Sequence, residues 1–323
     1  MRKLFLLFCL LTASATQAKE CLEIALRENN DRLVLEAANG SAKPGRSARA
    51  IAKDFRAIYQ AVEGQKKLNA GTDALIDKLS QELLAPLTSQ IQRASCVVFQ
   101  INQSQKYYML DLLSINNQPL FLEKPVGFAF KKNADFAIRL SQSARGLILR
   151  DPDADPQNGT GKAGEIFPGS KFKLMKQTNT GIFSGSVDFL LVSGHGSVSM
   201  PWDDEDEEDD SIGFNDEELT PEIFGRAKHK LAYLDSCQLG VSQSFINASR
   251  KAGSNYYMAP VISNEAGNSS TLTISYFFAA LREGQLPIIA LHNTRKRIYN
   301  EFKGRASRER LLYYAYPFRL YAL

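Results

Sequence analysis

Four short apolar runs dominate the second half of this 323-residue chain. Each has the length and composition of a buried strand, and they cover residues 146–149, 187–192, 230–234 and 255–260. Helical patterns separate the last three runs, and two more, at 272–283 and 287–302, follow the fourth. Strands that alternate with helices cross over between parallel neighbours, so this half predicts an α/β fold, with a mostly parallel sheet and helices on both faces.

The first half of the chain shows different secondary-structure patterns. Residues 19–45 predict a short element and a loop, residues 46–63 an amphipathic helix, and a second helix follows Thr72 and ends near Pro86. Short strands joined by tight turns are predicted at residues 96–101, 107–115 and 120–122. We therefore divide the chain into an N-terminal helical segment, 19–69, and a domain, 70–323, in which a helix and hairpin lead-in, 70–145, precedes a core, 146–323.

The N-terminus has the layout of a secretory signal peptide. Arg2 and Lys3 precede the apolar run 4–11, and small and polar residues lead to a predicted cleavage site after Ala18. The alternative is a buried N-terminal helix. The apolar run is about half of the ~20 residues that span a bilayer, so we expect no permanent membrane anchor. The sequence predicts an exported protein, periplasmic or secreted.

Removal of residues 1–18 leaves three cysteines, Cys21, Cys96 and Cys237. Three is an odd number for an oxidising compartment, so one thiol is expected to be unpaired. A bridge between Cys21 and Cys96 would leave Cys237 free.

The charged residues are unevenly distributed. The net charge of +4 is too small to argue for nucleic acid as a partner, and Arg295–Arg310 is locally basic. Residues 203–210 are all acidic, and three further acids extend this run to residue 218. Three interpretations of the run are open: a solvated, disordered loop, a contact with the basic surface, or a calcium site. It lacks the spaced glycine of an EF-hand loop.

Two of the predicted strands end in residues that carry chemistry. Strand 187–192 runs into Gly194-His195-Gly196, and strand 230–234 runs into Asp235-Ser236-Cys237. Functional residues of open parallel sheets collect at the carboxyl ends of the strands. If these two strands are parallel neighbours, His195 and Cys237 project from the same edge of the sheet, as a Cys–His pair.

Such a pair can perform nucleophilic catalysis. A thiol with its ordinary pKa of ~8.5 needs a base, and His195 would take the proton or stabilise the thiolate. A helix predicted from Val241 would favour negative charge near Cys237. The amides of Gly196 and Cys237 would hold the oxyanion of a tetrahedral intermediate. This chemistry requires no cofactor and no metal.

Each signal also has a purely structural explanation. A lone Cys at a strand end is most often a small buried hydrophobic residue, and Gly-His-Gly alone is a weak motif. Their joint occurrence on successive strand ends favours a His195–Cys237 dyad. His229 and His292 fit less well, because one lies in a Lys-rich loop and the other on a predicted basic helix.

The two strand ends resemble those of the caspase-like cysteine peptidases, and within that group the chain looks most like a CHAT domain. The similarity covers roughly residues 70–300. The histidine block, 189–196, and the cysteine block, 234–240, are specific in combination. Looser matches lie at residues 83–87, 146–152, 164–169, 252–261 and 277–281. The resemblance implies a caspase-like three-layer αβα sandwich with His195 and Cys237 as the catalytic pair. The chain departs from the family at Asp235-Ser236, where Ser-Ala is usual.

An Asp two residues before the Cys is similar to metacaspases and clostripain-like peptidases, in which it recognises Arg or Lys. By that analogy Asp235 would lie in the S1 pocket, and the alternative is a structural contact with nearby backbone amides. The leading hypothesis is an exported cysteine endopeptidase that cleaves peptide or protein substrates after Arg or Lys. The rival is a catalytically silent binding module of the cell envelope that acts with a partner protein, and acyl transfer is a third alternative.

Overall fold

The computed structural model describes residues 21–63, 70–202, 210–214 and 217–323. The predicted signal peptide and acidic residues 203–209 and 216 lie outside these ranges. Within them, no helix is long and apolar enough to cross a membrane.

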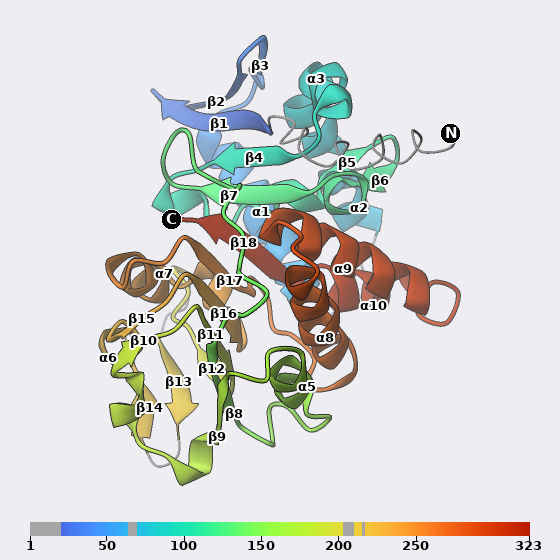
Figure 1. Ribbon diagram of the computed structural model, residues 1–323. Coiled ribbons are helices and arrows are strands. Elements are labelled where there is room, and N and C mark those ends of the chain that lie inside the picture. Colours follow the sequence, from blue (N-terminus) through green and yellow to red (C-terminus); the bar gives the residue numbers. More distant parts are fainter. Residues whose placement is uncertain (1–20, 64–69, 203–209, 215–216) are drawn as a thin grey trace, which may run out of the picture.

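An eleven-stranded mixed sheet forms the centre of the protein (Figure 1). In spatial order its strands are β3 (Gly40–Ala42), β2 (Arg32–Ala37), β1 (Leu22–Asn29), β4 (Val97–Gln100), β7 (Val126–Ala129), β18 (Phe318–Ala322), β17 (Tyr256–Pro260), β16 (Leu231–Asp235), β11 (Phe189–Ser193), β8 (Gly146–Arg150) and β9 (Lys171–Leu174). Only β1–β2, β2–β3 and β17–β18 pair antiparallel. The predicted α/β class with a mostly parallel sheet is confirmed.

The four apolar runs form four adjacent parallel strands, in the order β17, β16, β11 and β8. Nearly every residue in them is buried. Continuous apolar runs of this kind occur where both faces of a sheet are covered, because residues on either side of the pleat then need an apolar environment. The alternation of apolar runs and helical patterns in the sequence therefore predicted this part of the fold correctly.

Alternate residues of these strands enter two separate hydrophobic cores. Leu191, Tyr233 and Met258 face one core, and their neighbours Leu190 and Ala232 face the other. The helices around the two cores, with the smaller ones of the periphery, are α1 (Ala48–Glu63), α2 (Ala70–Leu79), α3 (Thr88–Arg93), α4 (Leu120–Glu123), α5 (Gly159–Ile166), α6 (Pro221–Phe224), α7 (Gln243–Lys251), α8 (Asn268–Arg282), α9 (Pro287–Phe302) and α10 (Arg308–Ala315). Residues of α5, α8 and α9 contribute to the first core and residues of α1 and α7 to the second, so the sheet has helices on both faces.

The predicted organisation of residues 19–69 is wrong in its first half. Residues 22–42 form three strands of the central sheet, where the sequence had predicted a short element and a loop in a helical segment. Ile24 and Leu26 on β1 are buried with alternating spacing, and β1 pairs in parallel with β4. Positive φ angles at Asn30 and Asp31 provide the tight turn into β2. Helix α1 agrees closely with the prediction for 46–63.

The predicted strands at 107–115 and 120–122 are also wrong. Residues 110–112 form a 3-10 turn, and two-residue strands β5 (Ser114–Ile115) and β6 (Gln118–Pro119) precede the short helix α4. A surface hairpin exposes one of its faces to solvent, whereas all residues from Tyr107 to Leu113 are buried. The first predicted strand of this region, at 96–101, is confirmed as β4.

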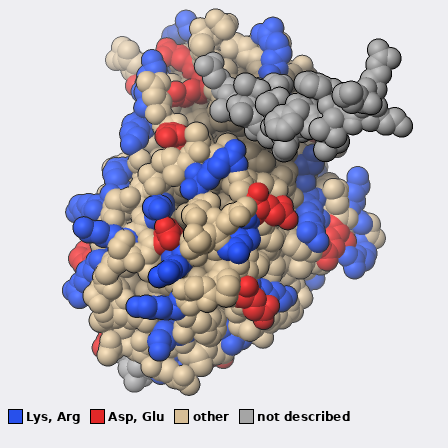
Figure 2. Space-filling view, in the orientation of Figure 1, with Lys and Arg blue, Asp and Glu red and all other residues tan. Residues whose placement is uncertain are grey.

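Among the described residues, the face shown in Figure 2 has no single-sign charged patch. Lys and Arg lie at many places on it, with Asp and Glu between them. The stretch Arg295–Arg310 contributes less to the surface than its sequence suggests, because Arg295 is only 3% exposed. Its guanidinium is part of the core.

Candidate active site

The parallel register of β11 and β16 brings the two predicted catalytic residues to one edge of the sheet. Ser193 and Asp235 are paired as the last residues of their strands. His195 and Cys237 each follow two residues later, so they leave the sheet side by side. Arg150, the last residue of β8, pairs with Ser193 on its other side, which brings the loop that contains Asp153 to the same edge.

Gly196 lies directly against the backbone of Cys237. A Cβ atom added to Gly196 would lie 3.1 Å from the Cys237 nitrogen, closer than nearly all real Cβ contacts. On its other side Gly196 opposes Ile212 in a small sheet formed by β12 (Gly196–Ser197), β13 (Ser211–Phe214) and β14 (Glu217–Leu219). The Gly213 amide donates to the His195 carbonyl at 2.9 Å, which makes Gly196 and Ile212 a non-hydrogen-bonded pair. The ladder therefore does not use the Gly196 amide.

The His195 side chain is exposed. The pKa of the Asp153 carboxyl is lowered chiefly by its hydrogen bond and ion pair with Lys176, and also by the His195 charge. Among the residues that the structure describes, histidine-ring hydrogen bonds are made by His229 and His292 and not by His195. Thus His195 and Cys237 are neighbours at the sheet edge, but their side chains are not hydrogen-bonded.

His229 and His292 are structural, as the sequence had suggested. Both are largely buried, and burial lowers the pKa of each to about 4. The His229 ring is held by the Ala227 carbonyl and the Ser249 hydroxyl. His292, on α9, contacts the Phe121 carbonyl of α4.

Cys237 is the free thiol. Cys21 and Cys96 form a disulfide, which leaves Cys237 partly exposed and unbridged. Burial raises the pKa of the Cys237 thiol, while the Asn264 amide and the Ser263 hydroxyl lower it. The carboxylates of Glu63 and Asp235 add to the rise. The thiol of the structure is therefore protonated at neutral pH and needs a base to become a nucleophile.

The turn after Cys237 is fixed by buried tyrosines. Residues Leu239–Val241 form a 3-10 turn, whose Leu239 carbonyl accepts a 2.7 Å hydrogen bond from the Tyr257 hydroxyl. The Gly240 carbonyl accepts another, also of 2.7 Å, from the Tyr321 hydroxyl. Gln238 has a φ of +61°, an unusual value for a residue with a side chain. These contacts define the path of the backbone beside the thiol.

Helix α7 begins later than predicted. It starts at Gln243 rather than at Val241, because the 3-10 turn occupies residues 239–241. The Ser242 hydroxyl caps the Phe245 amide and donates to Asp210, the last acid of the consecutive acidic run. The N-terminus of α7 is thus capped by Ser242, whose hydroxyl donates to Asp210.

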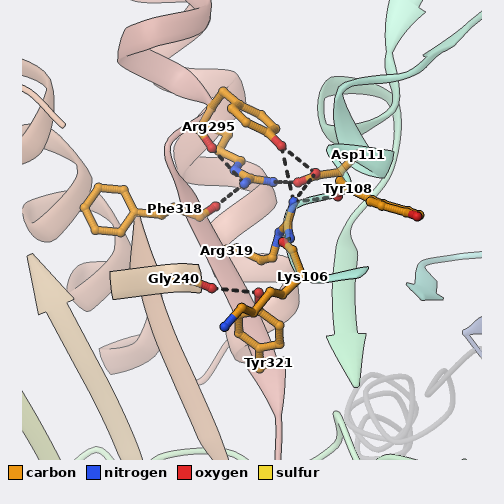
Figure 3. Close-up of polar contacts among 9 residues, drawn as sticks. Lys106, Tyr108, Asp111, Gly240, Arg295, Phe318, Arg319 and Tyr321 are labelled. Carbon is orange, nitrogen blue, oxygen red and sulfur yellow. Dashed lines mark hydrogen bonds and ion pairs between the residues drawn. The ribbon is translucent and has the colours of Figure 1, made fainter. Parts of the chain in front are cut away.

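A buried ionic cluster supports Tyr321. Asp111 contacts Arg295 at 3.3 Å and Arg319 at 3.5 Å, and all three residues are at most 3% exposed. Figure 3 shows these side chains in one group with Tyr321, which reaches from β18 to Gly240. Arg319 also donates to the carbonyls of residues 106 and 108. The cluster ties β18 and α9 to the segment that had been predicted as a strand.

Asp235 is buried beneath the site. It is 3% exposed, and it accepts 2.7 Å hydrogen bonds from the Ser193 and Ser270 hydroxyls and from the Asn264 side-chain amide. Burial raises the pKa of Asp235 to about 6, against the opposing effect of these donors. The alternative to an S1 role for Asp235 was a contact with nearby backbone amides. Its donors are side chains instead.

Four residues near the predicted pair were not found from the sequence. Asp153 could have been found from the sequence, because it follows the end of a third predicted strand, 146–149. Glu63, Ser263 and Tyr313 had none: the Ser263 amide and hydroxyl donate to Glu63, 200 residues away in the chain. Burial raises the pKa of Tyr313 to about 12, with smaller contributions from Cys237, Glu265 and Glu63.

The site offers no group for a metal ion. Within the described ranges, no three His, Cys, Asp or Glu side chains are gathered in a way that could hold one. Most of the acidic run, where calcium was an open alternative, lies outside those ranges. A cavity of about 690 Å³ lies elsewhere, between β1, β2 and α3 and beside the disulfide.

No family model matches this chain, and the curated proteins contain no match to it either.

Proposed function

We propose that this protein is an exported cysteine endopeptidase of the caspase-like group, close to the CHAT domains, with Cys237 as nucleophile and His195 as general base. The register of β11 and β16 carries the proposal, because it delivers the free thiol and an exposed imidazole to one sheet edge. The contact between Gly196 and Cys237 supports it, since two backbone amides lie close enough to form an oxyanion hole. The disulfide is consistent with export to an oxidising compartment.

The reaction begins when His195 removes the proton from Cys237. The thiolate attacks the scissile carbonyl carbon, and the Gly196 and Cys237 amides stabilise the oxyanion. The amine leaves with the proton that His195 holds, and a thioester remains on Cys237. His195 then takes a proton from water, the hydroxide attacks the thioester, and the carboxylic product leaves as Cys237 recovers its proton.

To reach the thiol, the His195 side chain rotates about its side-chain bonds. It is exposed and makes no hydrogen bond with the described residues, so this rotation meets little resistance. Asp153 is itself exposed and paired with Lys176 at 2.8 Å.

The proposed substrates are peptides with Arg or Lys before the scissile bond. The resemblance assigns Asp235 to the S1 pocket. The three hydrogen bonds and the deep burial of that carboxylate leave little of it open to a substrate cation. The preference for Arg or Lys remains part of the proposal. The residue that would recognise the substrate cation is a separate question, because Asp235 is so deeply buried.

The test uses purified residues 19–323 and a fluorogenic peptide library varied at the residue before the scissile bond. Cleavage after Arg or Lys that is lost in both Cys237→Ala and His195→Ala would support the proposal. His292→Ala serves as the matched control, because His292 lies away from the site. Absence of turnover, with Cys237 inert to a peptide chloromethyl ketone, would contradict it.

A catalytically silent binding module is the second candidate. The observation that favours it is the lack of a hydrogen bond between the described side chains of His195 and Cys237, together with a raised thiol pKa. For this candidate we expect peptides to bind with equal affinity to the wild type and to Cys237→Ala, without turnover. Isothermal titration with the best library peptides distinguishes the two candidates.

A further inference from the structure

The last residue of α1, Glu63, lies at the rim of the proposed active site. Its carboxylate accepts hydrogen bonds from the Ser263 amide, at 2.6 Å, and from the Ser263 hydroxyl. The next residue, Asn264, donates a 2.7 Å hydrogen bond to Asp235, two residues before Cys237. Ser263 therefore holds the Glu63 carboxylate beside the end of β16, where the proposed nucleophile lies.

Glu63 differs from the other acidic residues of the site because no described cation pairs with its carboxylate. Asp153 is paired with Lys176, and Asp235 is buried among three donors. Glu63 is partly exposed and forms no ion pair within the part of the chain that the structure describes. A carboxylate has about four lone-pair positions, and the two Ser263 donors use only two of them. The remaining positions can accept a cation.

The electrostatics agree with this placement of Glu63. Its charge raises the Cys237 pKa more than the charge of Asp235 does, although Asp235 is only two residues away in the chain. Burial raises the pKa of Tyr313, and Cys237, Glu265 and Glu63 add smaller effects. Tyr313 is half-buried and offers an apolar ring to the stem of a long side chain.

We propose that Glu63 is the residue that binds the Arg or Lys side chain of the substrate. Ser263 holds its carboxylate in place, and the substrate cation supplies the missing ion pair. The inference rests on the proposed peptidase function and replaces Asp235 in the recognising role. Asp235 then acts as a buried support that positions Ser193, Asn264 and Ser270 around the site.

The test compares substrates that differ only in charge. Lysine and its neutral analogue norleucine are placed before the scissile bond, and kcat/KM is measured for the wild type, Glu63→Gln, Asp235→Asn and Glu301→Gln. Gln retains the size of Glu63 and an acceptor for Ser263. Glu301, which accepts from Tyr276 on the surface of α9, is the matched control.

We expect Glu63→Gln to lower kcat/KM for the lysine substrate by about 10- to 100-fold, as for loss of one charged hydrogen-bond partner. Cleavage of the norleucine substrate should not be slowed by Glu63→Gln, and Glu301→Gln should behave as the wild type with both substrates. An unchanged lysine preference in Glu63→Gln overturns the inference, and it does so without touching the peptidase proposal. Loss of the preference in Asp235→Asn alone would return the recognising role to Asp235.

A second measurement separates recognition from thiol reactivity. Removal of the Glu63 charge lowers the Cys237 pKa, so Glu63→Gln should react faster with iodoacetamide near neutral pH. Labelling rates with lysyl and norleucyl chloromethyl ketones are therefore divided by the iodoacetamide rate. The ratio of lysyl to norleucyl labelling should exceed one in the wild type and fall toward one in Glu63→Gln. This readout needs no turnover, and equal ratios in the two proteins overturn the inference. If the wild type neither turns over peptides nor labels, the peptidase proposal fails first.

Discussion

A Cβ atom at Gly196 would lie 2.7 Å from the carbonyl oxygen of Cys237, so a side chain at position 196 cannot coexist with the present path of the Cys237 backbone. The obstacle is backbone rather than a flexible side chain, and it cannot move without displacing the end of β16. The glycine after His195 is thus required by the approach of the two strand ends.

Gly196→Ala should separate the two strand ends. Displacement of an oxyanion donor lowers kcat by about 100-fold or more, and the overpacking costs about 1–3 kcal/mol of unfolding free energy. Gly213→Ala is the matched control, because a Cβ there meets only the His195 carbonyl oxygen, at 3.9 Å. Peptide hydrolysis and urea unfolding of both variants test the prediction, and equal activity would contradict it.

Asp235→Asn should change how stability depends on pH. The folded pKa of about 6 lies above the ~3.9 of an unfolded chain, so the folded state binds more protons between these values. The contribution of Asp235 to stability is therefore present at low pH and is lost as pH rises toward 6 and beyond. We expect the variant to gain roughly 2 kcal/mol relative to the wild type between pH 4 and pH 7.5. Parallel urea-unfolding curves across this range would show that Asp235 does not titrate there.

Loss of the Cys21–Cys96 bridge should destabilise the protein but spare the site. The bridge spans 75 residues, and loop-closure entropy predicts a loss of at most about 4 kcal/mol. Strands β7, β18 and β17 lie between β4 and β16, so Cys237 is remote from it. We expect Cys21→Ser with Cys96→Ser to unfold at lower urea concentration and to retain the specific activity of its folded fraction. An unchanged midpoint, or activity lost before unfolding, would contradict this view.

The sequence could predict the parts of the fold that rest on local pattern. Four apolar runs identified β8, β11, β16 and β17, and their parallel pairing placed His195 and Cys237 together. The alternation of Ile24 and Leu26 on β1 was also present, but charged residues interrupt it, and the strand is completed by pairing with β4. Tertiary pairing there outweighs local preference.

The surroundings of the thiol could not be predicted in this way. Glu63 reaches Ser263 from the end of a helix that is unremarkable in sequence, and no spacing links the two residues. Asp111 stands in an apolar segment that the sequence predicts as a strand, and its charge is buried there because Arg295 and Arg319 meet it from α9 and β18. Such contacts depend on how distant elements pack, and they are visible only in the folded chain.

Tyr321→Phe should impair catalysis more than its effect on stability suggests. The change removes the hydroxyl that holds the Gly240 carbonyl, three residues after Cys237, and costs about 1–2 kcal/mol because a buried acceptor is left unpaired. The turn beside the thiol can then shift, so we expect kcat to fall severalfold while KM for the best peptide stays the same. Tyr276→Phe is the control, since its hydroxyl donates to Glu301 at the surface. Both variants are assayed well below their unfolding temperatures. If kcat of Tyr321→Phe matches the control there, the hydroxyl stabilises the fold without positioning Cys237.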